Sequence, residues 1–280
     1  MLKDITIGQY FPLNSVIHRL DPRVKLLYTF VFIIMIVVAN NFVSLAFCVA
    51  CALIVTFVSK VPLKTVIKGL KPIIFIIVIT SLLQIIYVKT GVTLISFWKI
   101  RITSGGVLEA VFLTFRISFL IVMSTMLTYT TSPTSMTNGL DRAFAPLTKL
   151  GIDFNIITMI MTIALRFIPT LIDEVDKIIS AQKSRGANFE TGSIFKRAKM
   201  LIPLFVPLLF NATRRAYELA YAMTCRCYNG GKGKTTMNAL KYKGGDWLVT
   251  VLTFTFIAGV IVLNIKFGEY NAKFIFNSAV

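Results

Sequence analysis

Long apolar runs, separated by short polar stretches, make up most of the chain. The first three runs have 16 or 17 residues, near the lower limit for crossing about 30 Å of hydrocarbon. The pair Asn40–Asn41 predicts a tight turn between the first two. The pattern therefore predicts an all-α membrane protein with about five transmembrane helices. These predicted spans are residues 24–39, 42–58, 73–88, 107–129 and 246–264.

The segment between the fourth and fifth predicted spans has a different, amphipathic pattern. Residues 154–172 are nearly as apolar as a span, but Arg166 and Pro169 interrupt them. From there to Ser184-Arg185-Gly186, apolar residues recur at the spacing of one helix face and polar residues take the other face. The apolar face consists of Leu171, Ile172, Val175, Ile178, Ile179 and Gln182, and the polar face consists of Asp173, Glu174, Asp176, Lys177 and Ser180. We expect a long helix that lies outside the membrane.

A second amphipathic helix is predicted from about residue 198 to 226. It begins with the apolar string MLIPLFVPLLF and ends at Cys225-Arg226-Cys227. Ala212, Ala216 and Ala220 recur every four residues, and small residues at that spacing let two helix backbones approach closely. We therefore expect the two long helices to cross at this alanine row.

These patterns predict three parts. Residues 1–130 form N-terminal membrane helices, residues 131–245 form a cytoplasmic region with the two long helices, and residues 246–280 form a C-terminal membrane helix and tail.

Charge gives the orientation of the predicted spans. The chain has 30 Lys and Arg against 12 Asp and Glu, a net charge of +18. In a soluble protein this excess would suggest nucleic acid, but cytoplasmic loops of membrane proteins carry a Lys and Arg excess. With the N-terminus in the cytoplasm, 24 basic residues fall on the cytoplasmic side and 5 outside. We expect a multi-pass protein of the cell (cytoplasmic) membrane, with no nucleic-acid partner.

Residue types that carry catalysis or bind metals are scarce. His18 is the only histidine, and its place near the membrane surface favours a structural role. Cys225 and Cys227 form a C-x-C without a second pair to complete a zinc site. The string NGGKGKTT (229–236) resembles a phosphate-binding loop, but Tyr228 stands where that motif needs glycine and a helix precedes it. This scarcity disfavours a membrane enzyme. We expect no catalytic residue, no metal and no cofactor in this chain.

A charged residue inside a predicted span has two interpretations. Arg116 could line a transport pathway, or it could face the helix bundle, toward Glu109 seven residues earlier. The second interpretation is favoured. Carboxylates are otherwise nearly absent from the spans, which argues against an ion-driven carrier. A self-sufficient carrier or channel nevertheless stays as the alternative function.

The two arginine-containing helix ends also have two interpretations. Basic residues and glycine are common at helix C-termini, because the dipole is negative there and glycine adopts the capping conformation. A pair of such ends on consecutive amphipathic helices instead suggests docking. An arginine fork suits a groove lined with carboxylates or carbonyls, and we favour docking.

The chain resembles the transmembrane T component of energy-coupling factor (ECF) transporters over nearly its whole length. The resemblance rests on HRLDPRVKLL (18–27), TTSPTSMTNGLDRAFAPLTKLGI (130–152), LRFIPTLIDEVDKIISAQKSRGA (165–187) and RRAYELAYAMTCRCY (214–228). The last two look like the coupling helices of the family, each ending in an X-Arg-Gly motif.

The resemblance implies a function without catalysis by this chain. Two partner ATPase subunits would hold ATP and Mg, and a membrane-embedded S component would bind a vitamin or other micronutrient. The two coupling helices would cross and dock on the ATPases. Ser184, Arg185 and Gly186 would contact one ATPase, and Cys225, Arg226 and Cys227 the other.

The second motif departs from the family pattern at Cys227, where glycine is typical. Glycine adopts a positive φ at little cost and cysteine does not. The sequence leaves two possibilities open: the second helix ends differently from the first, or it continues toward Asn229-Gly230-Gly231.

Overall fold

The computed structural model describes residues 10–97, 100–144, 154–187, 194–228 and 242–277. Helices form nearly all of its regular structure, which confirms the predicted all-α fold. The chain divides into two units. The membrane unit comprises the described residues of 8–139 and 240–280, and the helix-pair unit comprises the described residues of 140–239.

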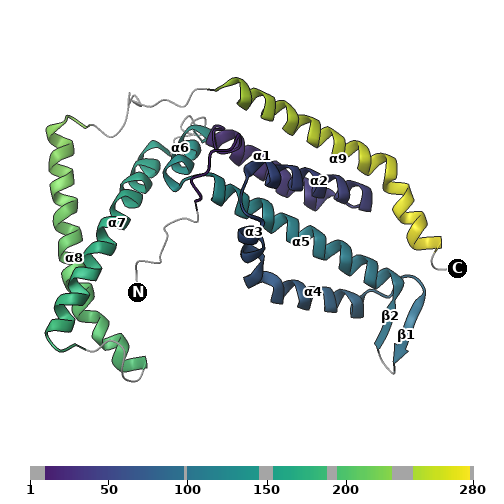
Figure 1. The fold of residues 1–280 in the computed structure, drawn as a ribbon, viewed down its shortest axis with the longest axis horizontal. Helices are drawn as coiled ribbons and strands as arrows, with labels where there is room; N and C mark the ends of the chain where they lie inside the picture. Colours follow the sequence, from purple (N-terminus) through teal and green to yellow (C-terminus); the bar gives the residue numbers. More distant parts are fainter. Residues whose placement is uncertain (1–9, 98–99, 145–153, 188–193, 229–241, 278–280) are drawn as a thin grey trace. The chain divides into compact units, whose positions relative to one another are not determined.

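In the membrane unit, the long helix α5 contacts α1, α2, α3 and α4, while α9 packs on α1 and α2. Figure 1 shows the resulting layers, with α4, α5, the α1–α2 pair and α9 in turn. The elements are α1 (Pro22–Val38), α2 (Phe42–Ser59), α3 (Leu63–Leu70), the 3-10 turn η1 (Lys71–Ile73), α4 (Ile74–Tyr87), β1 (Thr93–Phe97), β2 (Ile100–Thr103), α5 (Ser104–Thr130) and α9 (Gly244–Asn277).

Aromatic stacking holds the centre of the membrane unit. Phe32 of α1 is fully buried and stacks on Phe256 of α9, with ring centroids 5.7 Å apart. Phe47 of α2 stacks on the same Phe256 ring, also at 5.7 Å. Gly259 permits this packing, because a Cβ there would lie only 3.2 Å from the Phe47 ring. The core therefore ties α9 to the two N-terminal helices.

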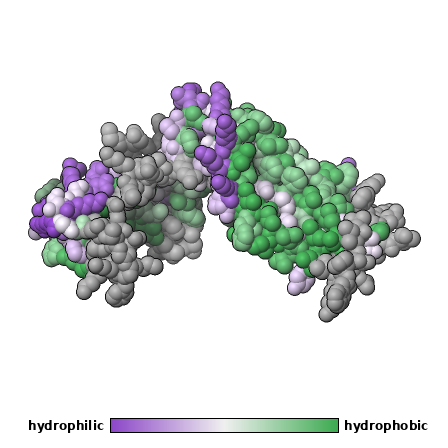
Figure 2. Space-filling model, turned by 60° about the horizontal axis from the view of Figure 1, so that its bottom comes forward, coloured by the Kyte–Doolittle hydropathy of each residue, from purple (hydrophilic) through white to green (hydrophobic). Residues whose placement is uncertain are grey.

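The outside of the membrane unit is apolar. Large side chains that are more than half exposed occur on α1, α2, α4 and α9, and Figure 2 shows a broad apolar surface over this unit. Helices are one of the two structures that can cross hydrocarbon, because they satisfy their backbone hydrogen bonds internally. This surface fits a multi-pass membrane protein.

Five described stretches are long and apolar enough to cross a membrane: Phe42–Ser59, Leu63–Tyr87, Ser104–Thr130, Ile156–Ser184 and Gly244–Phe267. Four of them correspond to predicted spans, and only the predicted span 73–88 extends beyond its stretch, by one residue. The predicted first span corresponds to α1, which has 17 residues, one fewer than the shortest of these five stretches. The helix that we expect outside the membrane meets the same length and composition.

A short antiparallel hairpin, which the sequence did not predict, joins α4 to α5. Thr93 pairs with Thr103, and Phe97 with Ile100. The Thr103 hydroxyl donates to the Val88 carbonyl at 2.8 Å and accepts from Gly106 N–H at 3.2 Å, so it caps α5. The helix consequently begins at Ser104, three residues before the predicted start.

The helix-pair unit is built on α7 (Phe154–Ser184) and α8 (Ile194–Cys225). α6 (Pro133–Ala143) contains the boundary between the two units. Figure 1 shows α7 and α8 running in opposite senses and crossing. Pro203 and Pro207 lie inside α8, where each removes a helix hydrogen bond.

Candidate functional site

The apolar face predicted for α7 is confirmed. All of its members are partly buried: Leu171, Ile172, Val175, Ile178, Ile179 and Gln182. On the opposite face Asp173, Lys177 and Ser180 are exposed. Glu174 and Asp176, which the sequence assigned to the polar face, are half-buried. The periodicity therefore identifies the packed side of the helix but not every polar contact at its edge.

A polar contact joins α7 to α8. Asn211 Nδ2 donates to Glu174 Oε1 at 2.5 Å, and Arg215 Nη2 lies 3.1 Å from Glu174 Oε2. The Glu174 side chain is only 13% exposed, so this carboxylate meets both partners largely out of water. The contact was not among the features predicted from the sequence. Its signal was an acidic residue at the edge of one helix and an arginine on the next.

The three alanines of the predicted crossing differ in burial. Ala212 is partly buried beside the Glu174 contact, whereas Ala216 and Ala220 are exposed. Partly buried positions instead recur as Leu204, Pro207, Leu208, Asn211, Ala212, Arg215, Leu219 and Met223. A role of the alanine row in the crossing stays a prediction.

The end of α7 is a complete Schellman motif. Gly186 has a φ of 87°, its N–H donates to Lys183 O at 3.0 Å, and Ala187 N–H donates to Gln182 O at 3.0 Å. These two bonds define the motif, and its left-handed residue favours glycine. We call Ser184, Arg185 and Gly186 the first tip. Arg185 is the last residue before the left-handed turn.

The end of α8 has the same motif, with Cys227 in the place of glycine. Cys227 has a φ of 57°, its N–H donates to Thr224 O at 2.9 Å, and Tyr228 N–H donates to Met223 O at 3.0 Å. We call Cys225, Arg226 and Cys227 the second tip. Of the two possibilities left by the sequence, a different ending and a continuation toward residue 229, neither occurs, because the cysteine adopts the left-handed conformation.

The two tips are matched in position as well as in hydrogen bonding. Arg185 lies 11 residues after Glu174, and Arg226 lies 11 residues after Arg215, its ion-pair partner on α8. At 1.5 Å per residue, each arginine lies about 17 Å beyond the contact between the helices. The helices run in opposite senses, so the two tips point away from each other (Figure 1).

Both tip arginines are exposed. Among the described residues, neither guanidinium forms a hydrogen bond or an ion pair. Cys225 and Cys227 are exposed free thiols. Each tip therefore presents an unpaired planar cation on a fixed backbone turn, which can bind a carboxylate or a row of carbonyls in two places at once.

His18, at the start of the first recognised motif, has hydrogen bonds that fit a neutral ring. Nε2 lies 3.0 Å from the Phe11 carbonyl, which can only accept, so this nitrogen carries the proton. Nδ1 then accepts from the Ser15 hydroxyl at 2.7 Å. Burial lowers the pKa of His18, and the ammonium of Lys25 lowers it further. The histidine orders the N-terminal segment.

Asp21 of the same motif takes part in the junction between α1 and α9. Asp246 is 2% exposed, and its two oxygens accept from Asp21 N–H and Lys243 N–H, each at 2.8 Å. Asp21 in turn caps α1 by accepting from Arg23 N–H at 3.0 Å. Sequence reasoning missed Asp246, although it is the acidic residue that opens the last apolar run.

Arg116 contacts a backbone carbonyl rather than its predicted partner. Its Nη2 donates to Ala39 O, and its guanidinium lies 4.6 Å from the centre of the Phe112 ring. Glu109 instead accepts from Gln84 Nε2 at 3.4 Å. Arg116 therefore faces the helix bundle, as the favoured interpretation expected, but among the described residues it forms no ion pair with Glu109 within 4 Å. The carbonyl that the arginine binds is at the end of α1, beside the turn at Asn40–Asn41.

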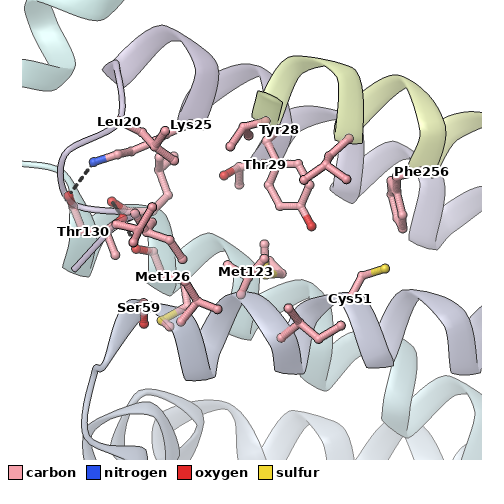
Figure 3. A pocket seen from close by; sticks show the side chains of 18 of the residues that line it. Leu20, Lys25, Tyr28, Thr29, Cys51, Ser59, Met123, Met126, Thr130 and Phe256 are labelled. Atoms are coloured by element: carbon pink, nitrogen blue, oxygen red, sulfur yellow. Dashed lines mark hydrogen bonds between the residues drawn. The ribbon is translucent and has the colours of Figure 1, made fainter. Parts of the chain in front are cut away.

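An open pocket of about 420 Å³ lies among α1, α2, α5 and α9 (Figure 3). Its lining is almost wholly aliphatic and aromatic, with thioethers from Met123 and Met126. At one end the Lys25 ammonium donates to Thr130 O at 2.9 Å and to His18 O at 3.2 Å. The pocket thus offers an apolar lining and an amine that is already bonded to two carbonyls.

Within the described residues, no group of three or more His, Cys, Asp or Glu side chains could hold a metal ion. The string NGGKGKTT (229–236), which resembles a phosphate-binding loop, lies outside the described residues.

Comparisons with known proteins give the family. A family model described as Cobalt transport protein (CbiQ) matches residues 13–237, a range that includes both tips. The Energy-coupling factor transporter transmembrane protein EcfT of Ruminiclostridium cellulolyticum is 43% identical over 267 residues, 95% of this chain and 100% of that protein.

Proteins of the same name show similar agreement. The one from Clostridium kluyveri is 42% identical over 270 residues, 96% of this chain and 100% of its own length. The one from Bacillus subtilis is 39% identical over 251 residues, 90% of this chain and 95% of its own. Similarity at this level over nearly the whole length is shared by members of one family. The chain belongs to the transmembrane, or T, components of energy-coupling factor transporters.

Proposed function

We propose that this chain is the non-catalytic coupling subunit of an ECF-type importer. It transmits the motion of two ATPase subunits, which hold ATP and Mg, to a membrane-embedded S component. The S component binds the substrate, a vitamin or other micronutrient. The N-terminus and the helix-pair unit lie in the cytoplasm, as the excess of basic residues on that side supports.

One observation carries the proposal: α7 and α8 end in the same hydrogen-bonded turn, each with an exposed, unpaired arginine just before it. Left-handed turns are common helix caps, but capping does not require an exposed arginine without a partner just before the turn of each helix. Two ATPase subunits with similar grooves would require two similar docking elements. The first tip would dock on one subunit and the second tip on the other.

The contact at Glu174 supports a mechanical role for the pair. It joins the helices midway between the tips, about 17 Å from each arginine. When the two ATPases move relative to each other, they would move the tips, and the joined helices would carry that motion to the rest of the chain.

The test compares two charge reversals of equal size. In Arg185→Glu/Arg226→Glu, each tip loses a charge-assisted contact worth about 1.5–3 kcal/mol and gains a repulsive charge. We expect this variant to insert into the membrane but to lose its ATPase subunits on purification. The control Lys177→Glu/Arg214→Glu, at exposed positions of the same two helices, should retain them.

Retention of active ATPases by the tip variant would contradict the docking role. Substrate uptake by the purified chain alone in lipid vesicles would instead support the alternative, a self-sufficient carrier or channel.

A further inference from the structure

The short helix α3 lies between two membrane helices and is rich in lysine. It follows α2 after three residues and leads through η1 into α4. Lys60, Lys64, Lys68 and Lys71 all lie in this short stretch and are exposed. Charged side chains are costly in hydrocarbon, whereas the apolar residues of α4 belong there. The stretch from Lys60 to Lys71 therefore lies at the level of the lipid headgroups.

One face of α3 packs on α5, which fixes its orientation. Val66 is 6% exposed and lies in a cluster with Val122, Met126 and Tyr129. Gly69 lets the helices approach closely, because a Cβ there would lie 3.0 Å from the Tyr129 hydroxyl. That hydroxyl donates to the Thr65 carbonyl at 3.4 Å. The opposite face of α3 must therefore point away from the protein.

The outward face has an apolar edge and a basic edge. Leu63 is 51% exposed and Ile67 is 63% exposed, and they share one side of the helix. At about 100° per residue, Lys64, Lys68 and Lys71 follow next to them around the axis. This division into an apolar strip and a basic strip is typical of helices that lie in the membrane interface.

The basic edge has no acidic neighbour to neutralise it. No Asp or Glu occurs between Asp21 and Glu109. Among the described residues, no carboxylate lies within 4 Å of any of the four lysine ammonium groups. The unpaired charge must be balanced from outside the chain.

We propose that the outward face of α3 binds anionic phospholipid headgroups of the adjoining leaflet. Leu63 and Ile67 enter the upper acyl region, while Lys64, Lys68 and Lys71 contact headgroup phosphates, with Lys60 beside them. The apolar strip then contacts acyl chains, and the basic strip contacts the negative charge that is absent from its neighbours in the chain. Lysines near an anionic membrane surface attract its lipids, and salt weakens that attraction.

The experiment places a fluorescent reporter on the face itself. Ile67→Trp is made in a chain with Trp98→Phe and Trp247→Phe, so that position 67 holds the sole tryptophan. The protein is reconstituted in phosphatidylcholine vesicles containing equal small fractions of brominated phosphatidylglycerol or brominated phosphatidylcholine. Bromine quenches the tryptophan on contact, so the ratio of the two quenching levels measures local enrichment of the anionic lipid.

We expect stronger quenching by the brominated anionic lipid, and a preference that falls with added salt. Lys64→Gln/Lys68→Gln should lower the preference by about fivefold for each lysine at low salt. The control Lys89→Gln/Lys266→Gln removes the same charge from exposed positions outside α3 and should leave the preference unchanged.

Equal quenching by the two lipids would overturn the proposal, as would an equal loss in the control variant. A preference seen in the isolated chain but absent from the assembled transporter would also overturn it, because the face would then be covered by a protein partner.

Discussion

The two tips show the same backbone geometry built from different residues. The first tip turns at Gly186, which accepts a positive φ freely, and the second turns at Cys227, for which that conformation costs about 1–2 kcal/mol. Both nevertheless make the same pair of Schellman hydrogen bonds. The two helices therefore share the position of an arginine just before a left-handed turn. They do not share the type of residue at the turn itself.

The contacts that join α7 to α8 differ from those that join the helices of the membrane unit. The membrane helices are held by buried aromatic stacking around Phe32 and Phe256. α7 and α8 add to their apolar packing a polar contact, in which a carboxylate meets an amide and a guanidinium. Because polar contacts are directional, this one fixes how the helices are aligned along each other, and so sets the equal distance to each tip.

The largest effect is expected from breaking the contact that aligns the tips. Glu174→Ala leaves Asn211 and Arg215 without their acceptor and should destabilise the helix pair by about 2 kcal/mol. Thermal unfolding of the purified protein in detergent measures the change. Glu218→Ala removes the exposed partner of Arg214, and this control should cost well under 1 kcal/mol. An equal loss of stability in the two variants would contradict the role of the Glu174 contact in aligning the helices.

Gly186→Ala isolates the cost of the left-handed turn at the first tip. A Cβ at this position meets no atom within 4 Å, so only the backbone conformation opposes it. We expect a local loss of about 1–2 kcal/mol, seen as faster hydrogen exchange at the amides of residues 186 and 187. Gly244→Ala is the control, since it also meets open space but lacks a positive φ. Unchanged exchange in Gly186→Ala would show that the turn is not maintained in solution.

The opposite change is expected at the second tip. Cys227→Gly relieves the strained φ and should slow exchange at residues 227 and 228 by an amount equivalent to about 1 kcal/mol. Cys225→Gly, at the last residue of the helix, should instead speed exchange, because glycine disfavours helix. Faster exchange in Cys227→Gly would mean that the two tips do not share a turn.

The smallest expected effect is a change of hydrogen exchange with pH, which should occur in the N-terminal segment and not at the tips. Burial lowers the pKa of His18, so the folded state favours the neutral ring. The resulting stability is complete above the unfolded pKa of about 6.5 and is lost as pH falls through the lower folded value. Hydrogen exchange should therefore quicken around residues 11–18 under mild acid, beyond the intrinsic pH effect. The tips contain no histidine and should not change, and His18→Asn should abolish the response.

Periodicity and capping chemistry were sufficient to predict much of the helix-pair unit. Apolar residues from Leu171 to Gln182 identified the packed face of α7, because one helix face must be buried. Glycine after a basic residue indicated where α7 ends, as left-handed caps favour it. The membrane helices were similarly evident from long apolar runs.

Other features depended on three-dimensional contacts that sequence spacing does not encode. Ala216 and Ala220 follow Ala212 at helical spacing, but both are exposed, and the partly buried positions include Asn211 and Arg215. Arg116 donates a hydrogen bond to a carbonyl at the end of another helix, although Glu109 is nearer in sequence. The turn at Cys227 could not be predicted from propensity, because hydrogen bonds on either side impose a conformation that cysteine disfavours.

The most direct test of the account asks what each tip touches in the assembled transporter. A photo-crosslinking residue is placed at 184 or at 225, beside each arginine, and at the exposed positions 170 and 213 near the helix contact as controls. The account predicts that position 184 crosslinks to one ATPase subunit and position 225 to the other, while the controls crosslink to neither. Crosslinking of the tips to ATPase at no more than the control level would contradict it.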